Sequence, residues 1–162
     1  MDSQSQVVNG TVRTIRYIGY NNFAQPERIL KPNGLVEQFA YNVDGTVKTQ
    51  TVGIGGNTGN IGGQTTTYMY NELKQIISEK RPDGDIISYK YNQSTGLIET
   101  KILPNGTVTD YYYHPIGSLY FQGTSNGLGN TGFYKGFNID QNGRVVNTSR
   151  GVGFDIKRES YS

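Results

Sequence analysis

Residues 91–113 read YNQSTGLIETKILPNGTVTDYYY, and this stretch contains every part of a unit that recurs along the chain. It opens on a tyrosine-asparagine pair, continues through a glycine and a strand-like run to the turn sequence Pro104-Asn105-Gly106, and closes on an alternating run that ends in tyrosine. Residues 6–119 repeat this pattern. A repeat of this length cannot bury its own apolar face, so successive units are expected to stack on one another.

The spacing of the repeated motifs is regular. We call the tyrosine that opens each unit the anchor tyrosine; successive anchors are separated by 21, 29, 21 and 22 residues, and the longest step holds the glycine-rich insert 53–63. Each turn glycine of a Pro-Asn-Gly or Pro-Asp-Gly sequence precedes the next anchor by seven residues. The anchors are Tyr20, Tyr41, Tyr70, Tyr91 and Tyr113, and the turn glycines are Gly34, Gly84 and Gly106. Proline fixes φ at one turn position and glycine supplies a positive φ at another, so the spacing predicts consecutive antiparallel hairpins.

The composition indicates an all-β protein. Of 162 residues, 34% are hydrophobic and 17% are charged, both below ordinary globular values, while there are 13 tyrosines and 22 glycines. Aromatic and β-branched residues pack well on pleated surfaces, and glycine occupies tight turns. Strands and turns are therefore favoured strongly over helices.

Charge and residue usage exclude several classes of function. The net charge of +2 comes from basic residues that alternate with acids along the chain, so no patch suited to nucleic acid is predicted. The absence of cysteine excludes disulfides, zinc-cysteine sites and thiol catalysis. No apolar run approaches the ~18 residues of a membrane-spanning helix. The first six residues lack the features of a signal peptide, so export would need another route or a precursor segment.

The aromatic residues before each anchor define a candidate ligand surface. Alternate residues of a strand share one face, so Tyr89 lies beside Tyr91, and Tyr111 beside Tyr113. Stacked hairpins would align such pairs into an aromatic ladder. The ladder is either the hydrophobic spine of the fold or an exposed platform for a carbohydrate or another surface ligand, for which Tyr89, Tyr91, Tyr111 and Tyr113 are the candidate binding residues.

The sequence contains no catalytic constellation, and no cofactor is predicted. The single histidine, His114, takes the place of the asparagine that follows other anchors, which favours a role in a turn. No spacing selects any two of the 13 acidic residues as a glycosidase pair. Asn138, Asp140 and Asn142 have the alternating oxygen ligands of a calcium loop, but the twelfth position is Ser149 where such a loop needs glutamate. They form a weak calcium candidate, with a plain Asn-Gly turn as the preferred interpretation.

We expect three segments along the chain. Residues 1–5 are polar and predicted to be disordered, residues 6–119 form the hairpin repeats, and residues 120–162 form a glycine-rich, irregular C-terminal cap or extension. The strands at 11–20 and 107–113 would then be the open edges of the ribbon. Because unpaired edge strands are hazardous, we expect the tail to cover the last strand or the chains to associate with each other or with a protein partner.

The repeated unit resembles that of the RHS or YD-repeat family, written Tyr-Asp-x-x-Gly followed by strand, turn and strand. Residues 41–45 and 113–117 place glycine at the fifth position, residues 91–96 have one residue more, and asparagine replaces the aspartate at four anchors. The resemblance implies a twisted, curved ribbon of hairpins, which in large members forms a hollow shell around a toxin or part of a surface adhesion protein.

From the resemblance we expect a non-enzymatic structural or interaction module of a bacterial secreted or cell-surface system. The chain is too short to enclose a cargo by itself, so it is expected to be a fragment, a small relative or a subunit that assembles. Two alternatives remain: a carbohydrate-binding or other ligand-binding module that uses exposed tyrosines, and a toxin tip in residues 120–162.

Overall fold

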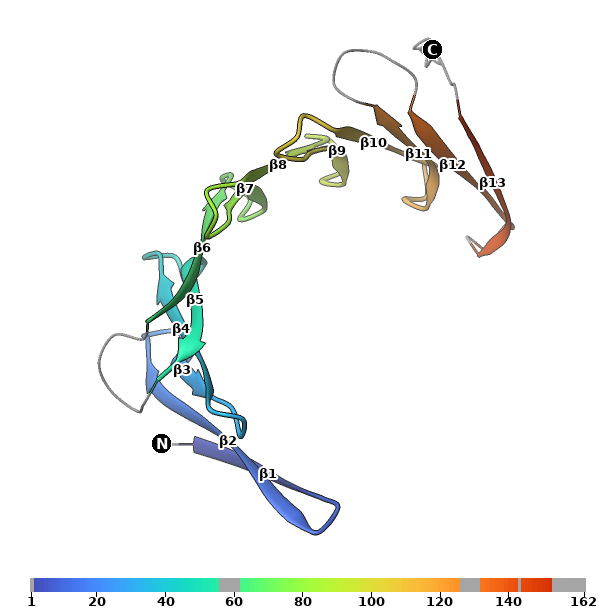
Figure 1. Cartoon of the computed structure of the whole chain (residues 1–162). Coiled ribbons are helices and arrows are strands. Elements are labelled where there is room, and N and C mark those ends of the chain that lie inside the picture. Colours follow the sequence, from blue (N-terminus) through green and yellow to red (C-terminus); the bar gives the residue numbers. More distant parts are fainter. Residues whose placement is uncertain (1, 56–61, 126–131, 143, 153–162) are drawn as a thin grey trace. The chain divides into compact units, whose positions relative to one another are not determined.

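The computed structural model describes residues 2–55, 62–125, 132–142 and 144–152, and it confirms the all-β prediction (Figure 1). No described residue lies in a helix, and the described residues form 13 strands. The strands are β1 (Asp2–Val8), β2 (Thr11–Tyr20), β3 (Pro26–Leu30), β4 (Leu35–Tyr41), β5 (Val47–Ile54), β6 (Gly62–Tyr70), β7 (Ile76–Lys80), β8 (Ile86–Tyr91), β9 (Ile98–Ile102), β10 (Val108–Tyr113), β11 (Leu119–Ser125), β12 (Phe133–Ile139) and β13 (Val145–Val152).

The chain divides into two structural units, each of which contains several of the sequence repeats. Met1–Asp85 holds β1 to β7, and Ile86–Ser162 holds β8 to β13. Within each unit every strand pairs antiparallel with the next strand along the chain. Strands of one unit contact only their sequence neighbours, so the described part of each unit is a single layer without a second sheet packed on it. The architecture is the predicted series of consecutive hairpins.

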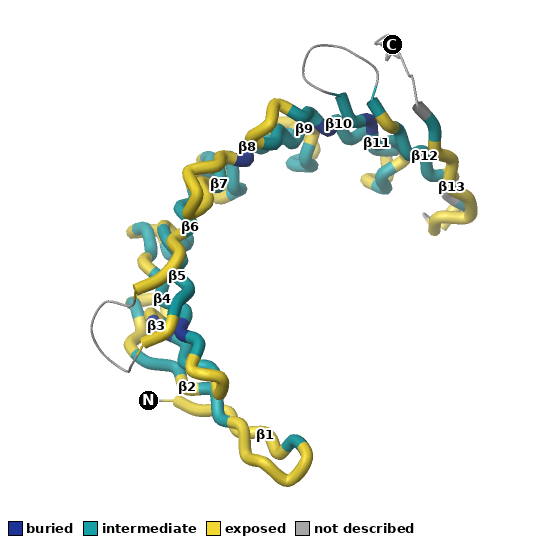
Figure 2. Tube along the Cα trace, viewed as in Figure 1, coloured by how far each residue is buried: buried dark blue, intermediate teal, exposed yellow. Residues whose placement is uncertain are grey.

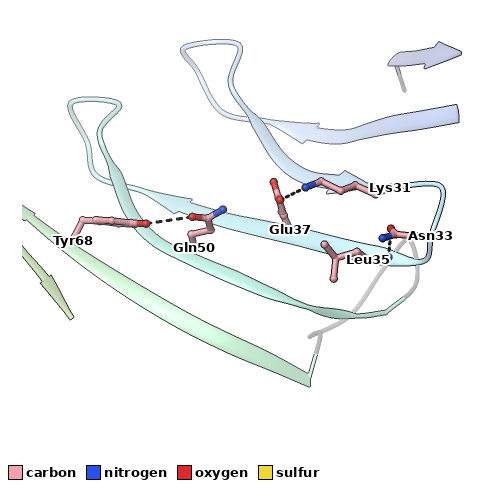
Figure 3. Close-up of polar contacts among 6 residues, drawn as sticks. All are labelled: Lys31, Asn33, Leu35, Glu37, Gln50 and Tyr68. Atoms are coloured by element: carbon pink, nitrogen blue, oxygen red, sulfur yellow. Dashed lines mark hydrogen bonds and ion pairs between the residues drawn. The ribbon is translucent and has the colours of Figure 1, made fainter. Parts of the chain in front are cut away.

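The proline-containing turns form as predicted. In the first, the Gly34 amide donates to the Lys31 carbonyl at 3.0 Å, and the Lys31 amide donates to the Leu35 carbonyl at 2.8 Å. The Asn33 side-chain oxygen accepts the Leu35 amide at 3.2 Å (Figure 3). Equivalent bonds close the turns that end at Gly84 and Gly106. Glycine has φ +81° at position 34, which is the left-handed conformation that a three-residue hairpin loop needs.

The turns after the anchor tyrosines have the same closure, and their asparagines explain it. Asn71 donates its amide to the Gln75 carbonyl, while its side-chain oxygen accepts the amides of Leu73 and Gln75, each at 3.0 Å. Asn21 makes the corresponding bonds to Phe23 and Gln25. Asparagine and aspartate side chains stabilise turns in this way because they replace a missing backbone acceptor. Asn21, Asn71 and Asn92 are therefore turn-capping residues, whereas the Asn42 side chain donates to the Thr46 hydroxyl and Asp44 accepts the Thr46 amide.

Two anchor turns adopt the left-handed conformation without glycine. The fifth residue, counted from the anchor tyrosine, has φ +84° at Gly45 and +86° at Gly117, whereas Ala24 and Lys74 occupy the same place with φ +56° and +60°. The two repeats without glycine at this place thus keep the turn geometry and put a side chain in a region that costs about 1–2 kcal/mol for an L-residue.

A β-bulge occurs at the end of every second strand from β4 onward. The register shifts between Ala40 and Tyr41, and the same shift recurs at the last residue of β6, β8, β10 and β12. In each case the following strand has one unpaired residue; these residues are Lys48, Ile77, Glu99, Tyr120 and Val146. A bulge increases the local right-handed twist, so twist is added at the same place in each hairpin. The β2–β3 hairpin has no bulge, because the two strands pair in one register.

The buried core is small. Among the described residues, only Val36 and Ile87 are buried hydrophobic side chains, each with 1% of its surface exposed. Arg28 and Thr109 are the buried polar residues, and the Arg28 guanidinium donates to the Gln38 side chain at 3.2 Å. Most other strand residues are half-buried (Figure 2). The free energy of folding is therefore distributed over many partly buried side chains and the strand hydrogen bonds.

The structure differs from the sequence prediction at both ends. Residues 2–5, which the sequence predicted to be disordered, belong to strand β1. This strand pairs with β2 from Asp2 and Tyr17 to Val8 and Thr11, so the backbone of this polar segment is ordered by pairing. At the other end, residues 119–125, 133–139 and 145–152 form β11 to β13, so the described part of the tail is regular hairpin. Residues 153–162 of the predicted cap lie outside the described residues.

The first prediction concerns the left-handed position at Ala24. Replacing Ala24 by glycine relieves about 1–2 kcal/mol of backbone strain in the folded chain. The greater entropy of the unfolded glycine variant opposes this gain by ~0.4–1 kcal/mol, so we expect a net stabilisation of about 0.5–1 kcal/mol. Urea denaturation measures it. Gly34→Ala is the matched control, because no atom lies within 4 Å of the added carbon and only the positive φ opposes it. That variant should lose stability, and a loss in Ala24→Gly would contradict the prediction.

Candidate functional site: the aromatic ladder and the outer strands

The anchor tyrosines connect adjacent strands through their hydroxyl groups. The Tyr41 hydroxyl donates to the Pro26 carbonyl at 2.7 Å, and the Tyr70 hydroxyl donates to the Val47 carbonyl at 2.8 Å. Pro26 and Val47 are the first residues of β3 and β5, so each ring lies across the strand that precedes its own. Both rings are half-buried. These two hydrogen bonds attach Tyr41 and Tyr70 to the neighbouring strand, so both anchors contribute to the packing of the sheet.

The rings two residues before the anchors lie on the same face and make their own contacts. Phe39 stacks on Tyr41 with centroids 6.2 Å apart, and the Tyr68 hydroxyl donates to the Gln50 side chain at 3.3 Å (Figure 3). The Lys101 ammonium lies 5.7 Å from the centre of the Tyr89 ring. The ladder predicted from the alternation is therefore built from half-buried rings, with polar atoms of neighbouring strands at its margin.

The four predicted ligand-binding tyrosines lie together in the second unit. Tyr89 and Tyr91 are in β8, Tyr111 and Tyr113 are in β10, and β9 pairs with both strands. All four rings are half-buried. Binding of a ligand by these residues remains a prediction.

Burial changes the acidity of the ladder tyrosines. It raises the pKa of Tyr41, Tyr68 and Tyr70 above the ordinary value of 10.0, and nearby carboxylates, Glu27 at Tyr41 and Glu79 at Tyr68, add to the effect. Burial likewise raises the pKa of Tyr91, Tyr111 and Tyr113. The uncharged phenol is the favoured form in the folded chain, as expected for a group that packs against apolar neighbours.

A second aromatic cluster, which sequence analysis missed, covers β10 to β12. Tyr112 contacts Phe121 and Tyr120, with centroid distances of 5.6 and 6.3 Å, and His114 lies 4.9 Å from Tyr120. Phe121 stacks on Tyr134 at 5.8 Å. Alternation places Tyr112 on the face opposite Tyr111 and Tyr113, and only the pairing of β11 and β12 brings the other rings to it.

Tyr134 ends this cluster against a glycine of the last strand. Tyr134 and Gly151 are cross-strand partners in β12 and β13. A β-carbon on Gly151 would come within 2.4 Å of the Tyr134 ring. The absence of a side chain at Gly151 lets the ring lie flat over the strand while it stacks on Phe121, and this packing connects the tail to the repeats.

The weak calcium candidate is an anchor turn. The Asp140 amide donates to the Arg144 carbonyl at 2.9 Å, as in the other anchor turns. One carboxylate oxygen of Asp140 accepts the amides of Asn142 and Arg144, and the other accepts the Arg144 guanidinium at 2.7–2.8 Å. These bonds from Arg144 and Asn142 lower the pKa of Asp140. Both oxygens thus serve the turn, and the described residues contain no group of three acidic, histidine or cysteine side chains placed to hold a metal.

His114 has the turn role predicted for it. Its amide donates to the Ser118 carbonyl, and its carbonyl accepts the Gly117 amide, each at 2.8–2.9 Å.

The part of the chain that the structure describes contains no long apolar helix of the kind that crosses a membrane.

The first strand of the first structural unit, β1, and the last described strand of the second, β13, are largely solvent-exposed. In β1, residues 2–7 are exposed, and in β13, residues 145–150 are exposed. Among the described residues, β1 pairs only with β2 and β13 pairs only with β12. Val7 and Val146 have 66% and 64% of their surface exposed. The edges predicted at 11–20 and 107–113 are therefore covered by β1 and β11, and β1 and β13 are the outermost described strands.

Comparison with solved structures finds the same arrangement of hairpins in parts of much larger chains. The crystal structure of TcdB2-TccC3-Cdc42 matches 83% of this chain with a TM-score of 0.64 at 15% identity. TcdB2-TccC3 without its hypervariable C-terminal region matches 88% with a TM-score of 0.61 at 13% identity, and the Tc holotoxin pore of Photorhabdus luminescens matches 87% with a TM-score of 0.58 at 12% identity. The fold is RHS-like.

The similarity covers a small share of those proteins, since this chain spans 7% of the first and 9% of the other two. No protein-family model and no curated protein matches the sequence. At 12–15% identity the match establishes the fold of the chain, and function has to be argued from its own residues.

The second prediction is a loss of stability at alkaline pH. Because burial raises the pKa of the ladder tyrosines above 10.0, folded and unfolded chains are both protonated below that value. Above it the unfolded chain ionises first, so the free energy of unfolding should fall as pH rises through the folded pKa values. Denaturant midpoints measured across this range test it.

Tyr70→Phe should lower stability by about 1 kcal/mol near neutral pH, because the hydroxyl bond to Val47 is lost, and should reduce the alkaline slope. Tyr120→Phe is the matched control, since this ring has 38% of its surface exposed. Equal slopes in all three proteins would show that the ladder rings are solvated.

The third prediction concerns the packing of Tyr134 on Gly151. Gly151→Ala should cost about 1–3 kcal/mol, because the new methyl group displaces the ring from its stack on Phe121. Gly62→Ala in β6 is the control, since no atom lies within 4 Å of its added carbon. Chemical denaturation of both variants decides the point: equal midpoints would show that Tyr134 does not occupy this position.

Proposed function

We propose that this chain is a non-enzymatic structural module, a segment of an RHS-type wall of β-hairpins that functions by joining further β-structure at its outer strands. The observation that carries the proposal is the pair of exposed outer strands, β1 and β13, on a chain whose described strands form single layers. The RHS-like fold shared with Tc toxin chains supports it.

The energetics of the chain support a role inside a larger assembly. A sheet with Val36 and Ile87 as its buried hydrophobic side chains, among the described residues, obtains its stability from contacts between successive hairpins. In such repeat architectures stability is nearly a sum of nearest-neighbour terms, and terminal repeats are protected by caps. Here the outer strands have no such cap within the described residues, so another strand at either edge would add a full set of contacts.

The residues also support a binding role over catalysis. Several of the described acidic residues engage turns and salt bridges, as Asp140 does with Arg144 and Glu37 does with Lys31 (Figure 3). The wall module is favoured over the alternative of a toxin tip in residues 120–162, because the described residues 119–125, 133–139 and 145–152 continue the series of strands. By analogy with the Tc toxin complexes, the partner is a protein of a secreted bacterial system.

A carbohydrate-binding module is the second candidate. It is favoured by the aromatic cluster of β10 to β12, where Tyr120 has 38% of its surface exposed, and by the half-buried Tyr89, Tyr91, Tyr111 and Tyr113. Sugar rings stack on such faces. Glycan-array binding that is lost in Tyr120→Ala and in Tyr91→Ala, with the fold intact by circular dichroism, would favour this candidate over the wall module.

The fourth prediction tests association through the outer strands. Light scattering of the full chain should show a mass that rises with concentration. The double variant Val7→Lys, Val146→Lys should remain a monomer, because charged lysines on edge strands oppose strand pairing.

The control for this experiment is Met69→Lys, Leu73→Lys, which removes two hydrophobic side chains of 60% and 69% exposure and adds the same charge away from the outer strands. It should associate as the unchanged chain does. The proposed function would be contradicted if the unchanged chain is monomeric at every concentration. It would also be contradicted if the control dissociates as fully as the Val7→Lys, Val146→Lys variant.

A further inference from the structure

The same tetrapeptide, Asn-Gly-Thr-Val, occurs at 9–12 and at 105–108 and folds into two different turns. At the first site Val8 pairs with Thr11, which leaves a two-residue loop in which Asn9 has φ +50° and Gly10 has φ +74°. At the second site the loop is one residue longer: Pro104 precedes the asparagine, and Gly106 alone has a positive φ, of +79°. The preceding residue, valine or proline, distinguishes the two sites.

The two turns treat the reactive atoms of an Asn-Gly step differently. At Gly106 the amide donates to the Leu103 carbonyl at 2.9 Å, and the Asn105 side-chain oxygen accepts the Thr107 amide at 3.0 Å. The Asn33-Gly34 step has the same two bonds, at 3.0 and 3.2 Å. Both the backbone nitrogen and the side-chain carboxamide are therefore held in place.

At the first site neither group is held. Within the described residues the Gly10 amide nitrogen and the Asn9 carboxamide have no hydrogen-bond partner. All three asparagines and their glycines are exposed, so access of solvent does not distinguish the sites. The loop at Asn9 also joins the outer strand β1, whose exposed residues open more readily than an interior hairpin.

From these differences we propose that Asn9 is a site of spontaneous deamidation, while Asn33 and Asn105 are protected by their turns. In this reaction the Gly10 nitrogen, losing its proton, forms a bond to the side-chain carbonyl carbon of Asn9, and the bond to the amide nitrogen breaks with release of ammonia. Water then opens the cyclic imide at either carbonyl and yields aspartate or isoaspartate. Water is the only co-reactant, and the sum is one amide and one water converted to one acid and one ammonia.

The modification acts on the strand that covers the first repeat. It places a carboxylate at a loop of two residues, and the isoaspartate product adds one methylene group to the backbone there. A two-residue loop with that extra atom cannot keep the Val8 to Thr11 register unchanged, so the pairing of β1 with β2 is altered at its closed end. The site is independent of the proposed wall function.

The experiment is peptide mapping by mass spectrometry of the full chain during incubation in mildly alkaline buffer. Asn9 should be converted at least about tenfold faster than Asn105 or Asn33, the factor that ~1.4 kcal/mol of added protection gives. In denaturant Asn9 and Asn105 should react at similar rates, because both are followed by Gly-Thr-Val. Equal rates in the folded chain, or faster reaction at Asn105, would overturn the proposal.

Two variants give a second measurement that does not depend on the peptide map. Asn9→Gly retains a residue suited to a positive φ and removes the reactive amide, so early ammonia release should fall by the share of Asn9, while the Asn-Gly steps at 126–127 and 142–143 are the same in every variant. Asn105→Gly is the matched control and should leave early ammonia release nearly unchanged. If both variants reduce it to the same extent, protection by the proline turn is refuted.

Discussion

The closed anchor turn is the interaction on which the rest of the structure depends. The asparagine side chain supplies the acceptor that the reversing backbone lacks, as Asn71 does for Leu73 and Gln75, and the preceding tyrosine donates its hydroxyl to the first carbonyl of the strand before its own, as Tyr70 does to Val47. One motif thus sets the direction of the chain and attaches it to the previous hairpin. Tyr41 makes the same bond to Pro26, so the repeated motif attaches successive hairpins in the same way.

A single layer of hairpins also explains the composition. With no second sheet over the described strands, few side chains can be fully buried, and half-buried aromatic rings supply apolar contact while their hydroxyl groups stay hydrogen-bonded. Tyrosine suits this environment better than phenylalanine or leucine, which explains the 13 tyrosines of the chain. The recurrent bulge beside the anchors adds twist at the same point of successive hairpins, so this twist is a property of the repeats.

Outer strands connect this architecture to the proposed role. A layer that is stabilised by sequential contacts is most exposed where the sequence of contacts ends, and β1 and β13 are the strands at those places within the two units. Polar residues in β1 reduce the affinity of that edge for wrong partners, whereas β13 presents valines beside Arg150. The proposed binding of further β-structure is a direct use of these strands, while carboxylates such as those of Asp44 and Asp140 are engaged in turns.

The sequence by itself determined the hairpins, their proline turns and the all-β class, because glycine, proline and asparagine act on the backbone within four residues and the tyrosine spacing repeats that local information. It did not reveal the last repeat, since Ile139 replaces the anchor tyrosine and Asp140 resembles a calcium ligand until Arg144 is seen to occupy it. Strand β1 was also missed, because polar residues show no buried face and only pairing with β2 orders them. Tertiary structure alone decided the bulges and the cluster of Tyr112, Phe121 and Tyr134, because each depends on register between strands, which local sequence does not encode.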